Sequence, residues 1–403
     1  MQSTVLTSLR PPLSPAPGGA AYPDLQATFA AVPDPRRAQG RRFSLPAMLT
    51  LAVAAILADH TSEQAIAEWG ADQDAATKRA LGFPKGITPH PSTIQRLFRR
   101  LDPLAVAAAL SRLFAPPPAE ERARGTAGVA IDGKAQRGRL PFATRAGTPV
   151  HALTASCHER QVVLAALPIT SRADKAEAEL TVAPALVARL DWRGRVLTGD
   201  ALLCQRALCQ QVLAAGGDYL LLVKENQPTL YRDIELLFDP PPATRPLPLL
   251  DRREARTRER GHGRHDEVRH LLASTDLTEY LDWPGVAQVI RIERTWQQQG
   301  RRKQHRHYGI TSLPPDVGPP ARLLDLKRGH WSIENRLHRR KDVTFGEDAS
   351  LVHLGHGPSI MAGLRDAAVS LLHQAGIDRV AERVRYHSRH PDAVLALLGL
   401  PLA

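Results

Sequence analysis

The sequence has few cysteines, and their number and spacing limit what they can do. Cys157, Cys204 and Cys209 are an odd set, and none of them has the paired spacing of a zinc ribbon. A stapled extracellular scaffold needs an even, dense cysteine framework. We therefore expect reduced thiols, as in a cytosolic protein, and no disulfides.

Long apolar runs are also missing. The longest run, residues 45–58, is shorter than the roughly 20 residues that cross a bilayer. It lies too far from the N-terminus for a signal peptide. Only 5% of the residues are aromatic, and no basic amphipathic stretch has the aromatic face of a membrane-surface helix. We expect a buried helix at 45–58 and no membrane partner.

Acidic residues are too few to balance the basic ones. The chain has 53 Lys and Arg against 41 Asp and Glu, a formal net charge of +12. These cations are spread along the whole length and are not confined to a tail. Such a field attracts polyanions, of which nucleic acid is the commonest for a soluble basic protein. With 403 residues, 43% of them hydrophobic, the chain can also form two or three domains with cores.

The N-terminal third reads as helical. Residues 1–22, rich in Pro, Ser, Gly and Ala, are expected to form a disordered arm. Residues 23–114 predict a small all-helical domain, in which Ser44, Thr61 and Ser92 are candidate helix caps. Arg96 and Arg99 lie on the polar side of its last basic helix, where they either contact duplex DNA or form a solvated face. Residues 115–127 read as a Pro-rich linker.

After the linker, strand patterns alternate with helix patterns, which predicts an α/β fold with a mixed sheet. Apolar runs at 128–134 and 194–200 each contain or end in an acid, Asp132 or Asp200. Because ligands collect at the carboxyl ends of parallel strands, we expect these two aspartates to be neighbours. The other expected elements are a hairpin over 151–168, helices at 183–190 and 203–215, a strand at 218–224, a mostly β insertion at about 231–320, a helix at 359–375 and a helical tail at 376–403.

One helical stretch, residues 327–342, has an unusual polar face. Lys327, His330, Glu334, His338 and Lys341 follow one another at spacings of three, four, four and three, which places them on one side of a continuous helix. The face carries one carboxylate among cations, as a site for both metal and phosphate requires. A basic surface helix with a chance alignment gives the same pattern.

The chemistry of three carboxylates, two from the strands and one from this helix, favours a metal site over a basic surface helix. Asp132, Asp200 and Glu334 would form an all-oxygen cluster suited to Mg²⁺ or Mn²⁺ and poor for zinc. Two such ions support in-line displacement at a phosphodiester. Crowded carboxylates repel unless a metal neutralises them, so the cluster predicts metal dependence. Lys224 and Asn226, in the Lys-Glu-Asn-Gln segment after the 218–224 strand, either line a DNA groove or form a polar turn.

Several segments together carry a family resemblance. They are VPDPR at 32–36, residues 94–102, VAIDGK at 129–134, VLTGDALLCQ at 196–205, GDYLLLVKENQP at 217–228, GHGR at 261–264, YGITSL at 308–313, HWSIENRLH at 330–338 and DVTFGED at 342–348. In this order they resemble the DDE transposases of bacterial insertion sequences, and most of all the H-repeat-associated group. His330 and Lys327 depart from the pattern, because related transposases have an arginine and a tyrosine there.

The resemblance implies a ribonuclease-H-like catalytic domain at 128–375 that moves its own element. Asp132, Asp200 and Glu334 would be the catalytic, metal-binding triad with two ions, and Lys341 would contact the element's end. A homodimer in a synaptic complex with terminal repeats and target DNA, in the bacterial cytoplasm at the nucleoid, is implied as well. A nuclease on the same core and an inactive or repurposed DNA-binding protein remain alternatives. The residues expected at DNA are Lys341, His338, His330, Lys327, Arg328, Lys224, Asn226, Arg264, Arg96 and Arg99.

Overall fold

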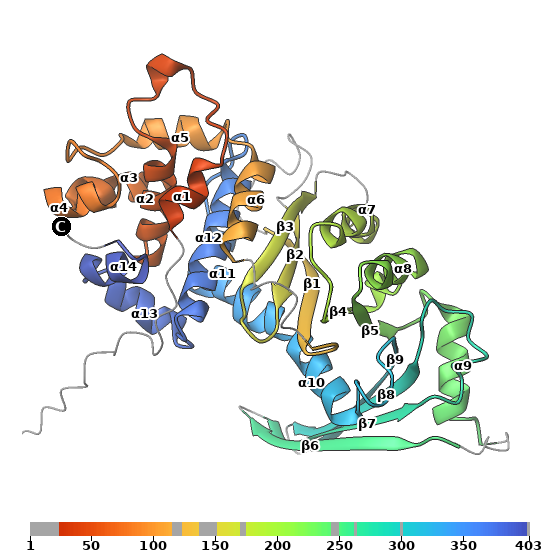
Figure 1. The fold of residues 1–403 in the computed structure, drawn as a ribbon. Helices are drawn as coiled ribbons and strands as arrows, with labels where there is room; N and C mark the ends of the chain where they lie inside the picture. The colour runs from red at the N-terminus through yellow and green to blue at the C-terminus, as the bar shows by residue number, and fades with distance from the viewer. Residues whose placement is uncertain are drawn as a thin grey trace, which may run out of the picture.

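A single sheet organises the α/β part of the chain. The computed structural model describes residues 24–114, 123–136, 151–169, 175–242, 250–261, 264–298 and 301–400. In this part, nine strands form one sheet in the order β3-β2-β1-β4-β5-β9-β8-β7-β6. Helices pack beside its first five strands, and a group of helices lies at the far end of the molecule from the β6–β9 strands (Figure 1).

The first five strands make a ribonuclease-H-like core. Strands β1 (Ala127–Ala135), β2 (His151–Cys157) and β3 (Val163–Ile169) pair antiparallel. Strands β4 (Arg195–Gly199) and β5 (Asp218–Val223) run parallel to β1, after α7 (Lys175–Val187) and α8 (Arg206–Ala214). Every residue of β4 and β5 is buried, as expected for parallel strands covered on both faces. The predicted fold class is confirmed.

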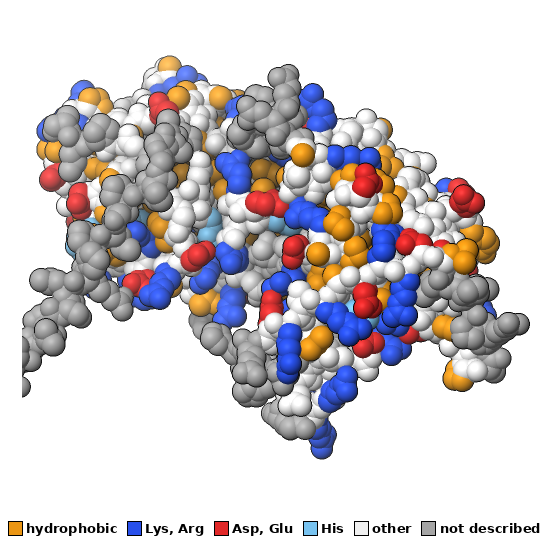
Figure 2. All heavy atoms as spheres, turned by 60° about the horizontal axis from the view of Figure 1, so that its bottom comes forward, with side chains coloured by type: hydrophobic (Ala, Val, Ile, Leu, Met, Phe, Trp, Pro, Cys, Tyr) orange, Lys and Arg blue, Asp and Glu red, His pale blue; other side chains and the backbone are white. Residues whose placement is uncertain are grey.

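The insertion extends this core sheet. It contains α9 (Pro228–Phe238), β6 (Arg253–Gly261), β7 (Arg264–Ser274), β8 (Gln288–Gln298) and β9 (Arg301–Thr311). Strand β9 pairs antiparallel with β5, so the insertion continues the sheet and forms no separate layer. Positions 301–306 of β9 are all exposed, because this end of the hairpin projects beyond the core. Figure 2, which turns the lower side of Figure 1 toward the reader, shows Lys and Arg side chains across this side with acids among them.

The N-terminal helices pack around one apolar helix. The elements are α1 (Leu25–Ala30), η1 (Ala38–Gly40), α2 (Leu45–Leu57), α3 (Glu63–Asp72), α4 (Ala75–Ala80), α5 (Pro91–Phe98) and α6 (Pro103–Leu113). All but one residue of α2 is buried. The stretch Ala38–Leu57 is long and apolar enough to cross a membrane, but 67% of its apolar window is buried inside the protein. A core helix of a helical bundle has this property, as predicted for residues 45–58.

The C-terminal helices join the two parts. They are α10 (Pro320–His330), the π-helical η4 (Ile333–His338), α11 (Arg339–Val343), the short η5 (Glu347–Ala349), α12 (Gly357–Gln374), α13 (Val380–His387) and α14 (Pro391–Leu397). Helix α12 packs against α2 and α6 on one side and β3 on the other. Gly376, with φ of +72°, ends it as predicted. One hydrophobic core therefore runs from the N-terminal helices into the sheet.

Four local predictions are wrong. The helix expected over 327–342 is interrupted at Trp331 and continues as the π-helical η4. Helix α7 begins at Lys175 and runs through Pro184, because burial of its apolar face against the sheet outweighs the hydrogen bond that proline removes. Ser44 caps α2 as predicted, but α3 and α5 are capped one and two residues from the expected positions, by Ser62 and His90.

Candidate active site

The two predicted aspartates lie opposite each other on neighbouring strands. Parallel strands β1 and β4 pair up to Ala130 and Thr198, and Asp132 and Asp200 each follow two residues later. Equal register on adjacent parallel strands, about 4.8 Å apart, directs both side chains to the same face of the sheet. The prediction that Asp132 lies at the tip of its strand is wrong, because β1 continues beside β2 to Ala135. The pairing of β1 with β4, however, ends at Ala130, before Asp132.

The helix carrying Glu334 covers the face to which both aspartates point. Thr198, on the same face as Asp200, has its Oγ1 3.4 Å from Nδ1 of His330 at the end of α10. His338, at the end of η4, has its Nδ1 3.5 Å from Oδ2 of Asp132. Glu334 lies about one turn from each of these histidines, on the stretch that passes over the strand ends.

The surroundings of the three carboxylates suit a hard cation. The Asp132 side chain is 35% exposed and Oδ1 accepts a hydrogen bond from the Gly133 amide. Asp200 and Glu334 are exposed, and Oδ1 of Asp200 accepts from the Leu202 amide at the start of η3 (Ala201–Leu203). These are oxygen donors open to solvent, which fits Mg²⁺ or Mn²⁺. Across the described ranges, no three His, Cys, Asp or Glu side chains are close enough together to hold a metal ion, so the structure gathers the aspartates but not the full triad.

Next to Thr198 lie two partly buried histidines, His158 and His330, that stay neutral. His158 places Nε2 2.9 Å from the Thr198 hydroxyl, between Gly128 and Gly329. Burial lowers the pKa of His158 to about 3, and nearby Arg322 and Lys327 lower it further. Burial likewise lowers the pKa of His330 to about 3. His330 therefore supports the helix from inside and presents no charge to DNA at neutral pH.

Lys327 is the cation next to Asp200. Burial lowers the pKa of Lys327 to about 8, although the Asp200 carboxylate opposes this shift. Its Nζ lies 5.8 Å from the centre of the Trp331 ring, which is itself 51% exposed. Lys327 is therefore charged at neutral pH and close to the boundary between the interior and solvent.

Lys341 lies in the protein interior. Its side chain is buried, with Nζ 2.8 Å from Oδ1 of Asp366 and 3.2 Å from Oε1 of Glu347. Burial alone would lower the pKa of Lys341, but these two carboxylates raise it overall. The expected contact with DNA needs an exposed ammonium, and the π-helical η4 instead rotates this residue toward α12. Sequence spacing could not reveal this, because it assumed an unbroken α-helix.

The segment after β5 supports the loop that follows Asp200. Asn226 donates from Nδ2 to the Ala201 carbonyl at 2.6 Å, and Gln227 donates from Nε2 to the Cys204 carbonyl at 3.0 Å. Lys224 is exposed. The polar-turn interpretation therefore accounts for Asn226. The Lys224 carbonyl also belongs to the turn, since it accepts from the Gln227 amide at 2.9 Å, but the residue is exposed to solvent.

The remaining predicted DNA contacts are dispersed. Arg328 is exposed at the end of α10 and forms an ion pair with Glu259 of β6. Arg264 begins β7, and its side chain lies outside the described residues. Arg96 and Arg99 are exposed at the end of α5.

An ion pair between β1 and α11 was not predicted. Lys134, two residues after Asp132, places Nζ 2.6 Å from Oδ1 of Asp342, eight residues after Glu334. This pair fixes the strand that carries one carboxylate against the helix that carries another. Both residues stand in the motifs that define the resemblance, but no sequence pattern pairs residues 208 positions apart.

Family models match most of the described chain. A family model described as "Transposase DDE domain" matches residues 124–365, and one described as "DDE_Tnp_1-associated" matches residues 26–114. A Xanthobacter autotrophicus protein described as "Uncharacterized protein in dhlA 3'region" is 32% identical over 75% of this chain and 98% of its own length.

Two further relatives carry more specific names. "Putative transposase YncI" of Escherichia coli O157:H7 is 28% identical, covering 91% of this chain and 92% of the relative. "H repeat-associated putative transposase YhhI" of Escherichia coli K12 is 26% identical, covering 92% and 97%. Among solved structures, the piggyBac transposase synaptic complex with hairpin DNA covers 93% of this chain and 77% of that one, at 10% identity and a TM-score of 0.41.

Proposed function

Since the chain belongs to the DDE transposase family, we propose that it is a metal-dependent DNA transposase that cleaves at the ends of its own insertion sequence and joins the freed 3′-hydroxyl to target DNA. The observation that best supports this is the placement of Asp132 and Asp200 at equal register, on the face crossed by the Glu334 helix. Both steps are attacks by an oxygen nucleophile on a phosphodiester, so one site can perform them in turn.

We assign Asp132, Asp200 and Glu334 as the residues that hold the metal. When bound, one or two Mg²⁺ or Mn²⁺ ions would activate the attacking water or hydroxyl and stabilise the leaving oxygen. Asp132 and Asp200 each accept a hydrogen bond from a backbone amide, of Gly133 and Leu202 respectively, and these bonds orient the two carboxylates. Lys134, through Asp342, fixes the distance between β1 and the Glu334 helix.

The DNA partner would be held by exposed cations. Of the predicted set, Lys327, Arg328, Lys224, Arg96 and Arg99 reach the surface at least in part and are proposed to contact phosphates. Arg264 belongs to this proposal by sequence alone. His330, His338, Asn226 and Lys341 have internal partners and are proposed as supports of the site.

The domain division predicted from sequence remains part of the proposal. Residues 23–114 would position DNA and residues 128–375 would cut and join it. Two element ends have to be held together, so we propose a homodimer. The bacterial cytoplasm, at the nucleoid, is the location where such a reaction meets its substrate.

The test is cleavage of a duplex that carries the terminal repeat flanking the gene, with Mg²⁺, Mn²⁺ or EDTA. We expect nicking at the repeat boundary with either metal, none with EDTA and none for Asp200→Ala. Nicking without joining of a pre-cut end would favour a nuclease. Binding without nicking under any condition would favour an inactive DNA-binding protein and overturn the proposal.

A further inference from the structure

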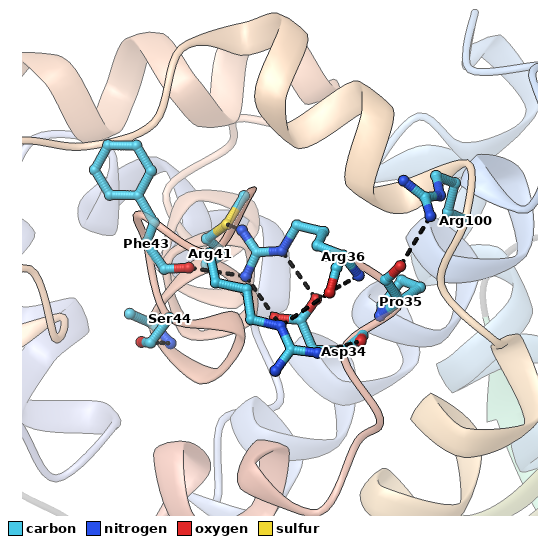
Figure 3. Close-up of polar contacts among 9 residues, drawn as sticks. Asp34, Pro35, Arg36, Arg41, Phe43, Ser44 and Arg100 are labelled. Atoms are coloured by element: carbon cyan, nitrogen blue, oxygen red, sulfur yellow. Dashed lines mark hydrogen bonds and ion pairs between the residues drawn. The ribbon is translucent and has the colours of Figure 1, made fainter. Parts of the chain in front are cut away.

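A loop between α1 and α2 is built around one buried arginine. Arg36 is 8% exposed and donates from Nε and Nη2 to the two carboxylate oxygens of Asp34, at 2.9 and 2.7 Å. Nη2 also donates to the Phe43 carbonyl at 2.8 Å, and Nη1 lies 3.3 Å from the Met48 sulfur. These bonds close residues 34–43 into a fixed turn (Figure 3).

The acid of this turn is fully engaged. Burial would raise the pKa of the Asp34 carboxyl, but hydrogen bonds and charge from Arg36, with charge from Arg41, lower it overall. Asp34 is therefore ionised at neutral pH and neutralised within the turn. Arg41 shares part of this charge, with Nε 3.7 Å from Oδ2 of Asp34, whereas the ion pairs of Asp34 do not include Arg37 or Arg42.

Two outer arginines are held in place by the backbone of the same turn. Arg41 donates from Nε to the Arg36 carbonyl at 2.9 Å and from Nη2 to the Asp34 carbonyl at 3.2 Å, while its side chain remains 52% exposed. Arg100, at the end of α5, donates from Nη2 to the Pro35 carbonyl at 2.8 Å. Both guanidinium groups are therefore immobilised at the surface, and the loop is attached to α5 (Figure 3).

Further arginines lie on the same two segments. Arg37 and Arg42 are exposed on the loop, and Arg96 and Arg99 are exposed on α5. Residues 32–43 and 91–102 together contain seven arginines and two aspartates. The second aspartate, Asp102, accepts a hydrogen bond from the Leu104 amide as the cap of α6. We call Arg37, Arg41, Arg42, Arg96, Arg99 and Arg100 the arginine surface.

We propose that the arginine surface binds the phosphate backbone of duplex DNA. Fixed guanidinium groups lose little entropy when they bind phosphate and present several donors to it. The one aromatic ring on the loop, Phe43, packs edge-on against Phe83 at 6.0 Å and is not presented for stacking on a base. The surface therefore recognises charge and spacing, not base sequence. This inference rests on the proposed transposase function and assigns to the N-terminal helices the part of DNA binding that does not depend on sequence.

The test is DNA binding in EDTA by the full chain, measured by fluorescence anisotropy over a series of salt concentrations. The variant is Arg37→Ala/Arg42→Ala/Arg96→Ala, which spares the two arginines bonded to the turn. Each lost phosphate contact should reduce the salt slope by about 0.9, and affinity should fall on the order of tenfold for every duplex sequence. The matched control is Arg189→Ala/Arg193→Ala, two exposed arginines before β4, at the end of the sheet away from Asp200.

Two further variants keep the test decisive. Arg37→Lys/Arg42→Lys/Arg96→Lys retains the charge and should restore most of the salt slope. If the triple alanine variant does not fold, Arg37→Glu alone should still weaken binding, because it places an acid on the exposed rim. If the triple alanine variant folds and binds DNA with the affinity and salt slope of wild type, the proposal of the arginine surface is refuted, while the proposed transposase function is unaffected. No binding of duplex DNA by wild type would refute this surface and the proposed function together.

Discussion

Replacement of Lys341 by methionine separates an interior role from a role at DNA. Methionine keeps the length of the apolar stem and removes the ammonium that lies 2.8 Å from Asp366 and 3.2 Å from Glu347. Both carboxylates are buried, so each would lose its nearest cation without gaining water. Two other cations remain near Glu347: Nζ of Lys134 lies 3.7 Å from its Oε2, and Nη1 of Arg365 lies 3.9 Å from its Oε1. They compensate the charge of Glu347 only in part, and burial already lowers the pKa of Arg365.

The expected cost follows from this geometry. Removal of one partner from a buried ion pair destabilises a protein by roughly 3–5 kcal/mol, because it leaves an uncompensated charge. Urea unfolding followed by circular dichroism should therefore show a large loss for Lys341→Met. Addition of Asp366→Asn to this variant should recover part of the loss, since it removes the buried charge that Lys341 contacted at 2.8 Å.

The control is an exposed lysine. Lys85→Met should change the free energy of unfolding by no more than about 0.5 kcal/mol. If Lys341→Met instead unfolds like wild type but binds the terminal repeat much more weakly, the ammonium reaches DNA. The assignment of Lys341 to the interior would then be wrong.

Three further predictions concern the helix that carries Glu334. Phosphate binds the charged form of Lys327, whose pKa is about 8, so DNA affinity should be intact below pH 8 and should fall as the pH rises through 8. Binding titrations over this pH range should show no such fall for Lys327→Arg. In Gly329→Ala, the new Cβ would lie 2.2 Å from Nδ1 of His158, so the helix that carries Glu334 must shift. DNA cleavage should then slow by about 10- to 100-fold while DNA binding is retained. An unchanged cleavage rate would mean that the position of this helix does not matter. Lys134→Met should cost about 1.5–3 kcal/mol in urea unfolding by removing the bond to Asp342, and additive effects of Lys134→Met and Asp342→Asn would show that the pair does not interact.

Sequence patterns predicted what depends on local order. Apolar runs bounded by acids and glycines identified β1, β4 and β5, and the rule that ligands gather at parallel strand ends predicted that Asp132 and Asp200 would be neighbours. The apolar stretch at 45–58 was correctly predicted to form a buried helix, because its apolar composition favours burial.

Features that depend on tertiary contacts were not predictable in this way. A π-helical segment has no pattern of its own, so the spacing of Lys327, Glu334 and Lys341 implied one continuous face that the structure divides. The partners of Lys341 and Lys134 are distant in sequence or arise from packing of α12. His158 stood in a hairpin turn, where nothing indicated that two glycines would enclose its ring.

The measurement that tests the central claim most directly is rescue of cysteine variants by a different metal. Asp132→Cys, Asp200→Cys and Glu334→Cys should each lose cleavage with Mg²⁺, which rejects sulfur ligands, and regain part of it with Mn²⁺, which tolerates them better. The native cysteines Cys157, Cys204 and Cys209 are buried and do not compete. Rescue at all three positions is the result we predict. Wild-type cleavage in both metals without rescue at any position would contradict the account, and rescue at the aspartates but not at position 334 would remove Glu334 from the metal site.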